Sequence, residues 1–596
     1  MKKTVPLVVL AFVVYLGALI PASAQGKPAV ATMAVSEIRP GMKGVALTVF
    51  QGTQPEPMEI EVLGVLNNAI GPKQDMILIR LKGTKPEYTG VVAGMSGSPV
   101  YVDGKLIGAL AFRIGEFSKE PIAGVTPIAQ MLEINELDRS VLPADAKYNA
   151  SGPQGAEKTA GPGAGSGPLG NLASMMTPIE TPLVFSGFTE DAVRRFGSQF
   201  ASAGVVPVMG AGSVTDQKQP EPLIPGAAVS AVLVRGDLNI AATCTVTYLD
   251  ADHLLACGHP LLKFGQVDIP MTKANVVATL PSPLNAFKII NTTEQVGSFV
   301  QDRNSGMLGR FRKEPDMIPV TLSVRGISRP RNFHYSVLNN ARLTPVAVMA
   351  TAYSILQGLN EYGDDVTYRF QGRIDVNGYP EVKMQDMFSP TDSSTPTAAS
   401  LALSLGERFG RIYDNPYAKP SIKSVQLDLE LVPERRWARL EGARTDITEA
   451  RPGDDIVVEA ALRPYRGERI VRRIPVRIPT SVPKGTLRIL VSDGDTIDRM
   501  RRMAPTARRL DLASTISMLN NERSNYKLYV SLLEANPEAM VEDKIMPSVP
   551  LSIMNVMDGM RGTQDMVVLG ESAVNEASTA LDFVVSGAQI ITLNVK

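Results

Sequence analysis

Residues 94–112 read GMSGSPVYVDGKLIGALAF. Two serines, two glycines and a proline fall within the first six positions, which predicts a tight turn. An alternating apolar strand, a Gly-Lys turn and a second apolar strand follow, so the segment predicts a turn that leads into a β-hairpin. Ser96 is therefore either a nucleophile raised on this turn or one of several small residues at the start of a hairpin.

The glycines around Ser96 favour the first interpretation. Gly94 and Gly97 leave the backbone free to turn and remove side chains from the space that a substrate carbonyl must enter. The N–H groups of Gly94 and Ser96 are then the expected oxyanion donors. The pattern G-x-S-G-x-P followed by a hairpin fits the serine turn of chymotrypsin-like double β-barrels.

A nucleophilic serine needs a base, and the chain has only three histidines. His259 ends a predicted strand in the sequence Cys-Gly-His-Pro and is the candidate general base. Taken alone it is equally well a structural histidine. His253 falls in a predicted turn and His334 alternates within a predicted strand, which indicates solvent-facing and structural roles. So few histidines and no C-x-x-C exclude a His-rich metal site, and no metal or other cofactor is expected.

Three segments resemble SpoIVB-type serine peptidases, the stage IV sporulation protein B family. Residues 89–110 resemble the serine motif of that family, and residues 245–260, TVTYLDADHLLACGHP, resemble its histidine segment. Residues 298–309, SFVQDRNSGMLG, resemble the continuation of the histidine segment. The resemblance implies that Ser96 is the nucleophile and His259 the general base.

The chain departs from that family in two ways. The family has its histidine segment before its serine segment, whereas here Ser96 comes first, which leaves open whether Ser96 and His259 meet within one chain. The family also carries an Asp shortly before its serine, where this chain reads LKGTKPEY. Asp268 is taken as the substitute acid, with Asp75 and Glu87 as alternatives, while Asp250 and Asp252 are interpreted as turn residues.

The two cysteines of the chain, Cys244 and Cys257, flank a predicted hairpin that turns at Asp250–Ala251. Pairing about that turn places them opposite each other, close enough for a disulfide. Two buried free thiols in a β core are the alternative.

The N-terminus has the features of a secretory signal peptide. Lys2 and Lys3 form a basic start, residues 5–20 are mostly apolar, and Ala22-Ser23-Ala24 is a cleavage site of the A-x-A type. A permanent anchor helix is the alternative, although the apolar run is short for a bilayer. We expect a bacterial protein that is periplasmic or secreted, with no membrane span after cleavage.

Length and composition predict a large, mostly β protein of several domains. The 596 residues exceed one core, and equal numbers of basic and acidic residues, 60 each, give no sign of nucleic acid as a partner. We expect a chymotrypsin-like double β-barrel module split by a linker, followed by β-sandwich-like and mixed α/β accessory regions. The predicted divisions are 1–24 (signal peptide), 25–148 (serine half), 149–171 (Gly/Pro-rich linker), 172–343 (histidine half), 344–420 (helical connection), 421–494 (β-sandwich-like) and 495–596 (mixed α/β). Helices are predicted at 125–137, 344–359, 397–413 and 507–519.

These features lead to two functional hypotheses. The first is a serine endopeptidase that hydrolyses a protein or peptide substrate through Ser96 and His259. The second is a catalytically inactive, peptidase-like binding or scaffold protein of the cell envelope. An arginine run in residues 463–477 is interpreted as the solvated face of a strand pair, with a polyanion-binding patch as the alternative. The oligomeric state is not predicted.

Overall fold

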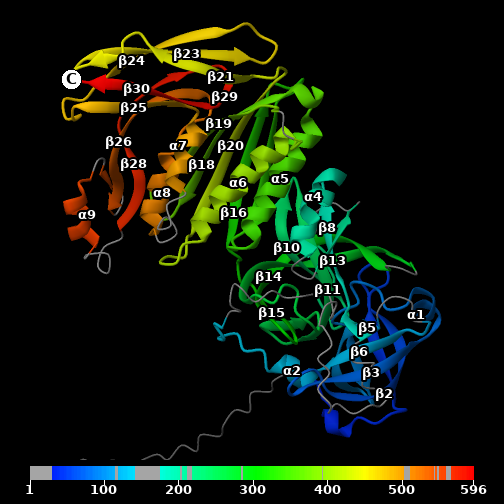
Figure 1. Cartoon of the computed structure of the whole chain (residues 1–596). Coiled ribbons are helices and arrows are strands. Elements are labelled where there is room, and N and C mark those ends of the chain that lie inside the picture. Colours follow the sequence, from blue (N-terminus) through cyan, green and yellow to red (C-terminus); the bar gives the residue numbers. More distant parts are fainter. Residues whose placement is uncertain are drawn as a thin grey trace, which may run out of the picture.

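The computed structural model describes residues 30–114, 119–140, 175–201, 205–210, 218–282, 286–391, 394–502, 510–541, 544–546, 549–558 and 566–596. Figure 1 shows N-terminal strands at one end of the molecule and a separate group of C-terminal sheets at the other, joined by a large twisted sheet with helices on one face. The predicted signal peptide and the predicted linker lie outside the described residues. In the part of the chain that is described, no helix is long and apolar enough to cross a membrane.

The serine half folds into a closed six-stranded barrel. The strands run in the order β4-β1-β2-β3-β6-β5, and β4 also pairs with β5, which closes the ring. Buried and more exposed residues alternate along β1 and the first half of β2, as in a barrel with a filled interior, whereas β3, β5 and β6 are buried over most of their length. Its elements are β1 (Lys43–Thr48), β2 (Glu56–Gly71), β3 (Gln74–Lys82), α1 (Thr84–Thr89), β4 (Pro99–Val102), β5 (Lys105–Ile114), β6 (Ile122–Pro127) and α2 (Ile128–Leu132).

The histidine half folds into a second six-stranded barrel. Its order is β10-β13-β14-β15-β12-β11, and pairing of β10 with β11 closes it. The predicted double β-barrel is therefore confirmed. The strands are β10 (Ala228–Gly236), β11 (Asn239–Leu249), β12 (His253–Ala256), β13 (Gly265–Leu280), β14 (Phe287–Arg303) and β15 (Gly306–Phe311).

Apolar side chains from both barrels meet in two buried clusters. One joins residues of the first barrel and α2 to residues of β12, β14 and β15: Leu106, Ala109, Ile128 and Met131 with Leu255, Val300 and Leu308. The other packs Val49 against Ala228, Ala274, Val276 and Ile290. Burial of this apolar surface holds the two barrels together. The short strand β7 (Met176–Pro178) pairs with β5, although it follows the predicted linker in sequence.

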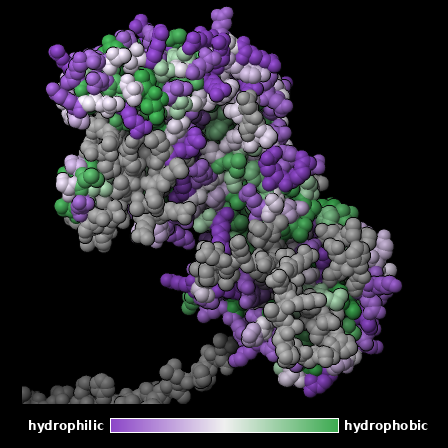
Figure 2. All heavy atoms as spheres, in the orientation of Figure 1, coloured by the Kyte–Doolittle hydropathy of each residue, from purple (hydrophilic) through white to green (hydrophobic). Residues whose placement is uncertain are grey.

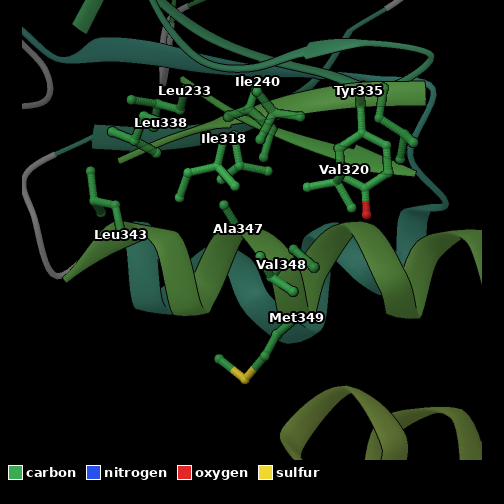
Figure 3. Packing of buried hydrophobic residues seen from close by; sticks show 14 of the residues in the cluster. Leu233, Ile240, Ile318, Val320, Tyr335, Leu338, Leu343, Ala347, Val348 and Met349 are labelled. Atoms are coloured by element: carbon green, nitrogen blue, oxygen red, sulfur yellow. The ribbon is translucent and has the colours of Figure 1, made fainter. Parts of the chain in front are cut away.

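The second barrel opens into a longer sheet. Strand β17 pairs with β10 and carries the sheet on through β16, β20, β18 and β19, while β8 and β9 extend it from β11. The added elements are β8 (Thr181–Ser186), α4 (Glu190–Ala201), β9 (Val205–Met209), β16 (Met317–Arg325), β17 (Arg331–Leu338), α5 (Leu343–Leu359), β18 (Thr367–Val376), β19 (Val382–Phe388), α6 (Thr397–Tyr413) and β20 (Ile422–Val432). Figure 3 shows Ala347 of α5 facing Ile318 and Val320 of the sheet, while Met349 points away from the sheet. Met349 packs against Gly406 of α6, so α5 is buried on both sides, which explains why this helix is apolar on nearly all sides.

The C-terminal part is a β-sandwich with helices beside it. Its two sheets share one core, to which Leu440 and Val458 contribute from one side and Ile489 and Leu528 from the other. One sheet consists of β24 (Ile470–Arg477), β23 (Asp455–Pro464), β21 (Trp437–Thr445) and β29 (Val584–Ser586). The other contains β22 (Glu449–Ala450), β30 (Ala588–Val595), β25 (Gly485–Ser492), β26 (Lys527–Val541), β27 (Lys544–Met546) and β28 (Met566–Ala580). The helices are α7 (Gly494–Arg502), α8 (Leu512–Asn520) and α9 (Leu551–Asp558).

The arginine run lies on the outer face of this sandwich. Arg463 and Arg469 both form ion pairs with Glu441, and Arg473 pairs with Glu459. Each of the three arginine side chains is more than half exposed. Figure 2 shows hydrophilic side chains along this edge of the molecule. These exposed, ion-paired side chains agree with the interpretation of the arginine run as the solvated face of a strand pair.

Candidate active site

The serine turn is a pair of successive β-turns that only glycine allows at two positions. The N–H of Met95 donates to the Val92 carbonyl and the N–H of Ser98 to the Met95 carbonyl, both at 3.0 Å. Gly94 and Gly97 have φ angles of +97° and +92°, in the left-handed region that L side chains avoid. The turn thus presents Ser96 at its tip, as the sequence predicts.

Three polar groups of this turn are left without a partner. Ser96 is fully buried, and its Oγ has no hydrogen-bond partner. The N–H groups of Gly94 and Ser96, the predicted oxyanion donors, meet no acceptor within the described part of the chain. Buried polar groups are nearly always paired, so a cluster of unpaired ones indicates a place where a ligand is expected.

The tip of the turn docks onto strand β11 of the second barrel. The N–H of Thr245 donates to the Ser96 carbonyl at 2.8 Å, and its Oγ1 donates to the Gly94 carbonyl at 3.1 Å. Thr247 Oγ1 donates to the Gly97 carbonyl at 2.7 Å. The serine turn therefore contacts the histidine half within one chain, despite the swapped order in the sequence.

The histidine segment is fixed against the same turn. A Cβ atom on Gly97 would lie 2.5 Å from the Cys257 nitrogen, so the two backbones are in direct contact. Thr126 Oγ1 of the first barrel donates to the Gly258 carbonyl at 2.6 Å. Cys257 is joined to Cys244 by a disulfide, which ties the segment to the strand that contacts Ser96.

His259 is held in the protonation state that a general base requires. Its Nδ1 lies 2.8 Å from the Pro260 carbonyl, which can only accept, so Nδ1 carries the proton and Nε2 the free lone pair. Burial lowers the pKa of His259, and hydrogen bonding to the backbone of Pro260 and Ile179 acts in the opposite direction. The imidazole is therefore neutral near pH 7. Nε2 is buried and has no hydrogen-bond partner, Ser96 Oγ included.

The prediction of Asp268 as the orienting acid does not agree with the geometry. Its carboxylate forms an ion pair with Lys313 and accepts from the N–H of Asp316, away from the imidazole. The alternatives are also occupied, since Asp75 accepts from the Asn68 N–H and Glu87 from the Gly83 N–H. A backbone carbonyl takes the place of the acid on Nδ1.

Asp302 is a positioning residue that the sequence reasoning missed. It is buried at the end of β14, and its carboxylate accepts the N–H groups of Leu261 at 2.8 Å and Leu262 at 2.7 Å. Burial raises the pKa of Asp302 to about 6, although these hydrogen bonds lower it. It fixes the loop that follows His259. An acidic residue within the apolar run SFVQD was the available signal.

The remaining histidines play no part in this site. His253 Nε2 pairs with Glu136 at 2.9 Å, and the backbone N–H of His334 donates to Asp237. Among the residues that the structure describes, no group of His, Cys, Asp and Glu is arranged to hold a metal ion.

A cavity of about 360 Å³ lies beyond the loop that Asp302 fixes. Lys263, Gly265 and Asp302 line it together with residues of α2 and the segment after it. Neither Ser96 nor His259 lines this cavity, and His259 is only 3% exposed. The candidate site is therefore closed to substrate in this conformation.

The comparison with protein families bears on the first barrel. Residues 20–129 match the family model of the SpoIVB peptidase S55. The matched residues include the serine turn, which confirms the resemblance of residues 89–110 to the serine motif of that family. His259 lies outside the matched residues. No curated protein and no solved structure matches the chain.

Proposed function

We propose that this protein is a serine endopeptidase of the SpoIVB type, exported from the cytoplasm. Ser96 attacks the peptide carbonyl, and His259 Nε2 accepts its proton and returns it to the leaving amine. The N–H groups of Gly94 and Ser96 bind the oxyanion. The family match at residues 20–129 supports peptidase activity on a protein or peptide.

One observation carries the assignment of these residues. The unpaired Ser96 Oγ and the two unpaired N–H groups occupy a turn that contacts the segment bearing the unpaired His259 Nε2. Because Ser96 Oγ and His259 Nε2 make no hydrogen bond, their catalytic contact has to form when substrate enters. Such contacts are often long in free enzymes and shorten in the substrate complex.

Labelling with a fluorophosphonate probe tests this function. We expect the protein without its first 24 residues to form a covalent adduct on Ser96 during a prolonged incubation. The S96A variant should form none, and H259A should label at least about 100-fold more slowly, because the base activates the hydroxyl. S98A and H253A are matched controls, since Ser98 Oγ bonds to the Met95 carbonyl and His253 pairs with Glu136.

A catalytically inactive scaffold is the second candidate. The complete burial of Ser96 and the absence of a carboxylate on His259 Nδ1 favour it. If the folded wild-type protein labels no faster than S96A and leaves a fluorescent casein uncleaved, the peptidase assignment is wrong and the scaffold function is retained.

A further inference from the structure

Lys288 is a buried lysine that lies directly against the serine turn. It is 1% exposed, at the start of β14. Its backbone N–H donates to the Ala93 carbonyl at 3.2 Å, so β14 begins beside the residue that precedes Gly94. A Cβ atom on Gly94 would lie 3.3 Å from Lys288 Cδ and 3.5 Å from its Cγ. The alkyl chain therefore covers the open side of Gly94.

The amine of Lys288 has a neutral partner and no counter-ion in the described structure. Nζ donates to Thr48 Oγ1 at 2.8 Å, and Thr48 is itself fully buried. Thr279, opposite Lys288 in β13, is uncharged. Glu56, opposite Thr48 in β2, is ion-paired with Lys85. Burial alone lowers the pKa of Lys288 to about 7.

A lysine in this position weakens the folded state, because a charged amine without a counter-ion is costly to bury. Groups of this kind cluster at functional sites. Nζ is two bonds beyond Cδ and thus at most about 7 Å from Gly94 Cα. A substrate oxygen bound to the Gly94 N–H lies about 3 Å further on, so the two charges are on the order of 10 Å apart. A unit charge at that distance changes a rate roughly 15-fold in a medium with an effective dielectric constant near 20.

We propose that Lys288, as an ammonium whose alkyl chain packs against Gly94, stabilises the negative charge that develops on the substrate oxygen when Ser96 attacks. Its charge acts at a distance and touches no substrate atom, so Lys288 is a positioning residue. This inference rests on the proposed peptidase function. For the reaction to proceed, the imidazole of His259 must be neutral so that it can accept a proton, and the amine of Lys288 must be protonated so that it carries a charge.

The pH profile of fluorophosphonate labelling tests the role of Lys288. In the wild type the labelling rate should rise as His259 loses its proton below pH 6.5, and fall on the alkaline side of the optimum, from about pH 7, as Lys288 loses its own. K288M should label about 10- to 100-fold more slowly at the optimum and lack the alkaline fall. K288R should stay within a few-fold of the wild-type rate and also lack the fall, because guanidinium remains charged.

A second buried lysine provides the matched control. Lys273 in β13 is paired with Glu294, so K273M should retain the alkaline fall. The unfolding temperature of K288M at pH 7 should be no lower than that of the wild type, because the substitution removes a buried amine. Thermal unfolding of the two proteins measures this. Wild-type labelling with an unchanged rate and profile in K288M would overturn the role of Lys288 alone. Wild-type labelling no faster than that of S96A would overturn the peptidase function as well.

Discussion

Gly97 is a residue at which the backbones of the two barrels are in direct contact. A Cβ atom there would lie 2.1 Å from the Thr245 carbonyl oxygen and 2.5 Å from the Cys257 nitrogen, both backbone atoms that cannot move aside. We therefore expect G97A to separate the serine turn from β11 and to lower the free energy of unfolding by about 3 kcal/mol or more. Urea denaturation measures the loss.

Gly104 offers a matched control for this substitution. It also has a left-handed φ, +74°, in the turn between β4 and β5, but a Cβ atom there would meet nothing within 4 Å. G104A should cost only about 1 kcal/mol, the backbone penalty. Equal losses in G97A and G104A would mean that contact between the barrels does not depend on Gly97.

The residues that the sequence reveals are those whose chemistry is local. Ser96 is indicated by the glycines beside it. Lys288 and Asp302 acquire their environments from other strands: the first is buried by β1 and the serine turn, and the second bonds to a loop some forty positions earlier. The Pro260 carbonyl that orients His259 is a backbone atom and leaves no pattern in the sequence.

At the scale of elements, the disulfide joins Cys244, in the middle of β11, to Cys257, the residue after the end of β12, beside the serine turn. Cys244 and Cys257 are 13 residues apart, and closing a loop of that size stabilises a protein by about 3 kcal/mol. The C244S/C257S double variant should therefore unfold at a lower temperature, and reducing agent should lower the wild-type value to match. Reducing agent should leave the double variant unchanged. Equal unfolding temperatures in the oxidised wild type and the double variant would contradict this role.

Helices with a continuous apolar face are the elements that the sequence predicts best. The prediction for 397–413 coincides with α6, and that for 344–359 lies within one residue of α5. The helix predicted at 125–137 is shorter in the structure, where only residues 128–132 form α2. Val125 belongs to strand β6 instead and pairs with Ile77 of β3. Strands β18 and β19 lie inside the predicted helical connection, since partners distant in sequence decide which segments become strands.

At the scale of the whole molecule, sheet pairing crosses the divisions drawn from composition. Strand β20 follows residue 421, where a separate β domain was predicted to begin, yet it pairs in parallel with β16 and belongs to the sheet of the second barrel. Strand β7 follows the predicted linker, yet it pairs with β5 of the first barrel. Changes in composition mark where the chain loses apolar residues, whereas hydrogen bonding between strands joins segments on either side of them.

The contact between the barrels predicts that they remain together when the chain between them is cut. A protease recognition site inserted within residues 149–171 would, after cleavage, leave two fragments linked by apolar clusters and by the hydrogen bonds of Thr126, Thr245 and Thr247. We expect the fragments to elute together from a sizing column in native buffer and to separate in concentrated urea. Adding T245V and T247V to the cleaved protein should weaken the association measurably. Two separate peaks for the cleaved but otherwise unaltered protein would mean that the linker, and not the interface, holds Ser96 beside the histidine segment.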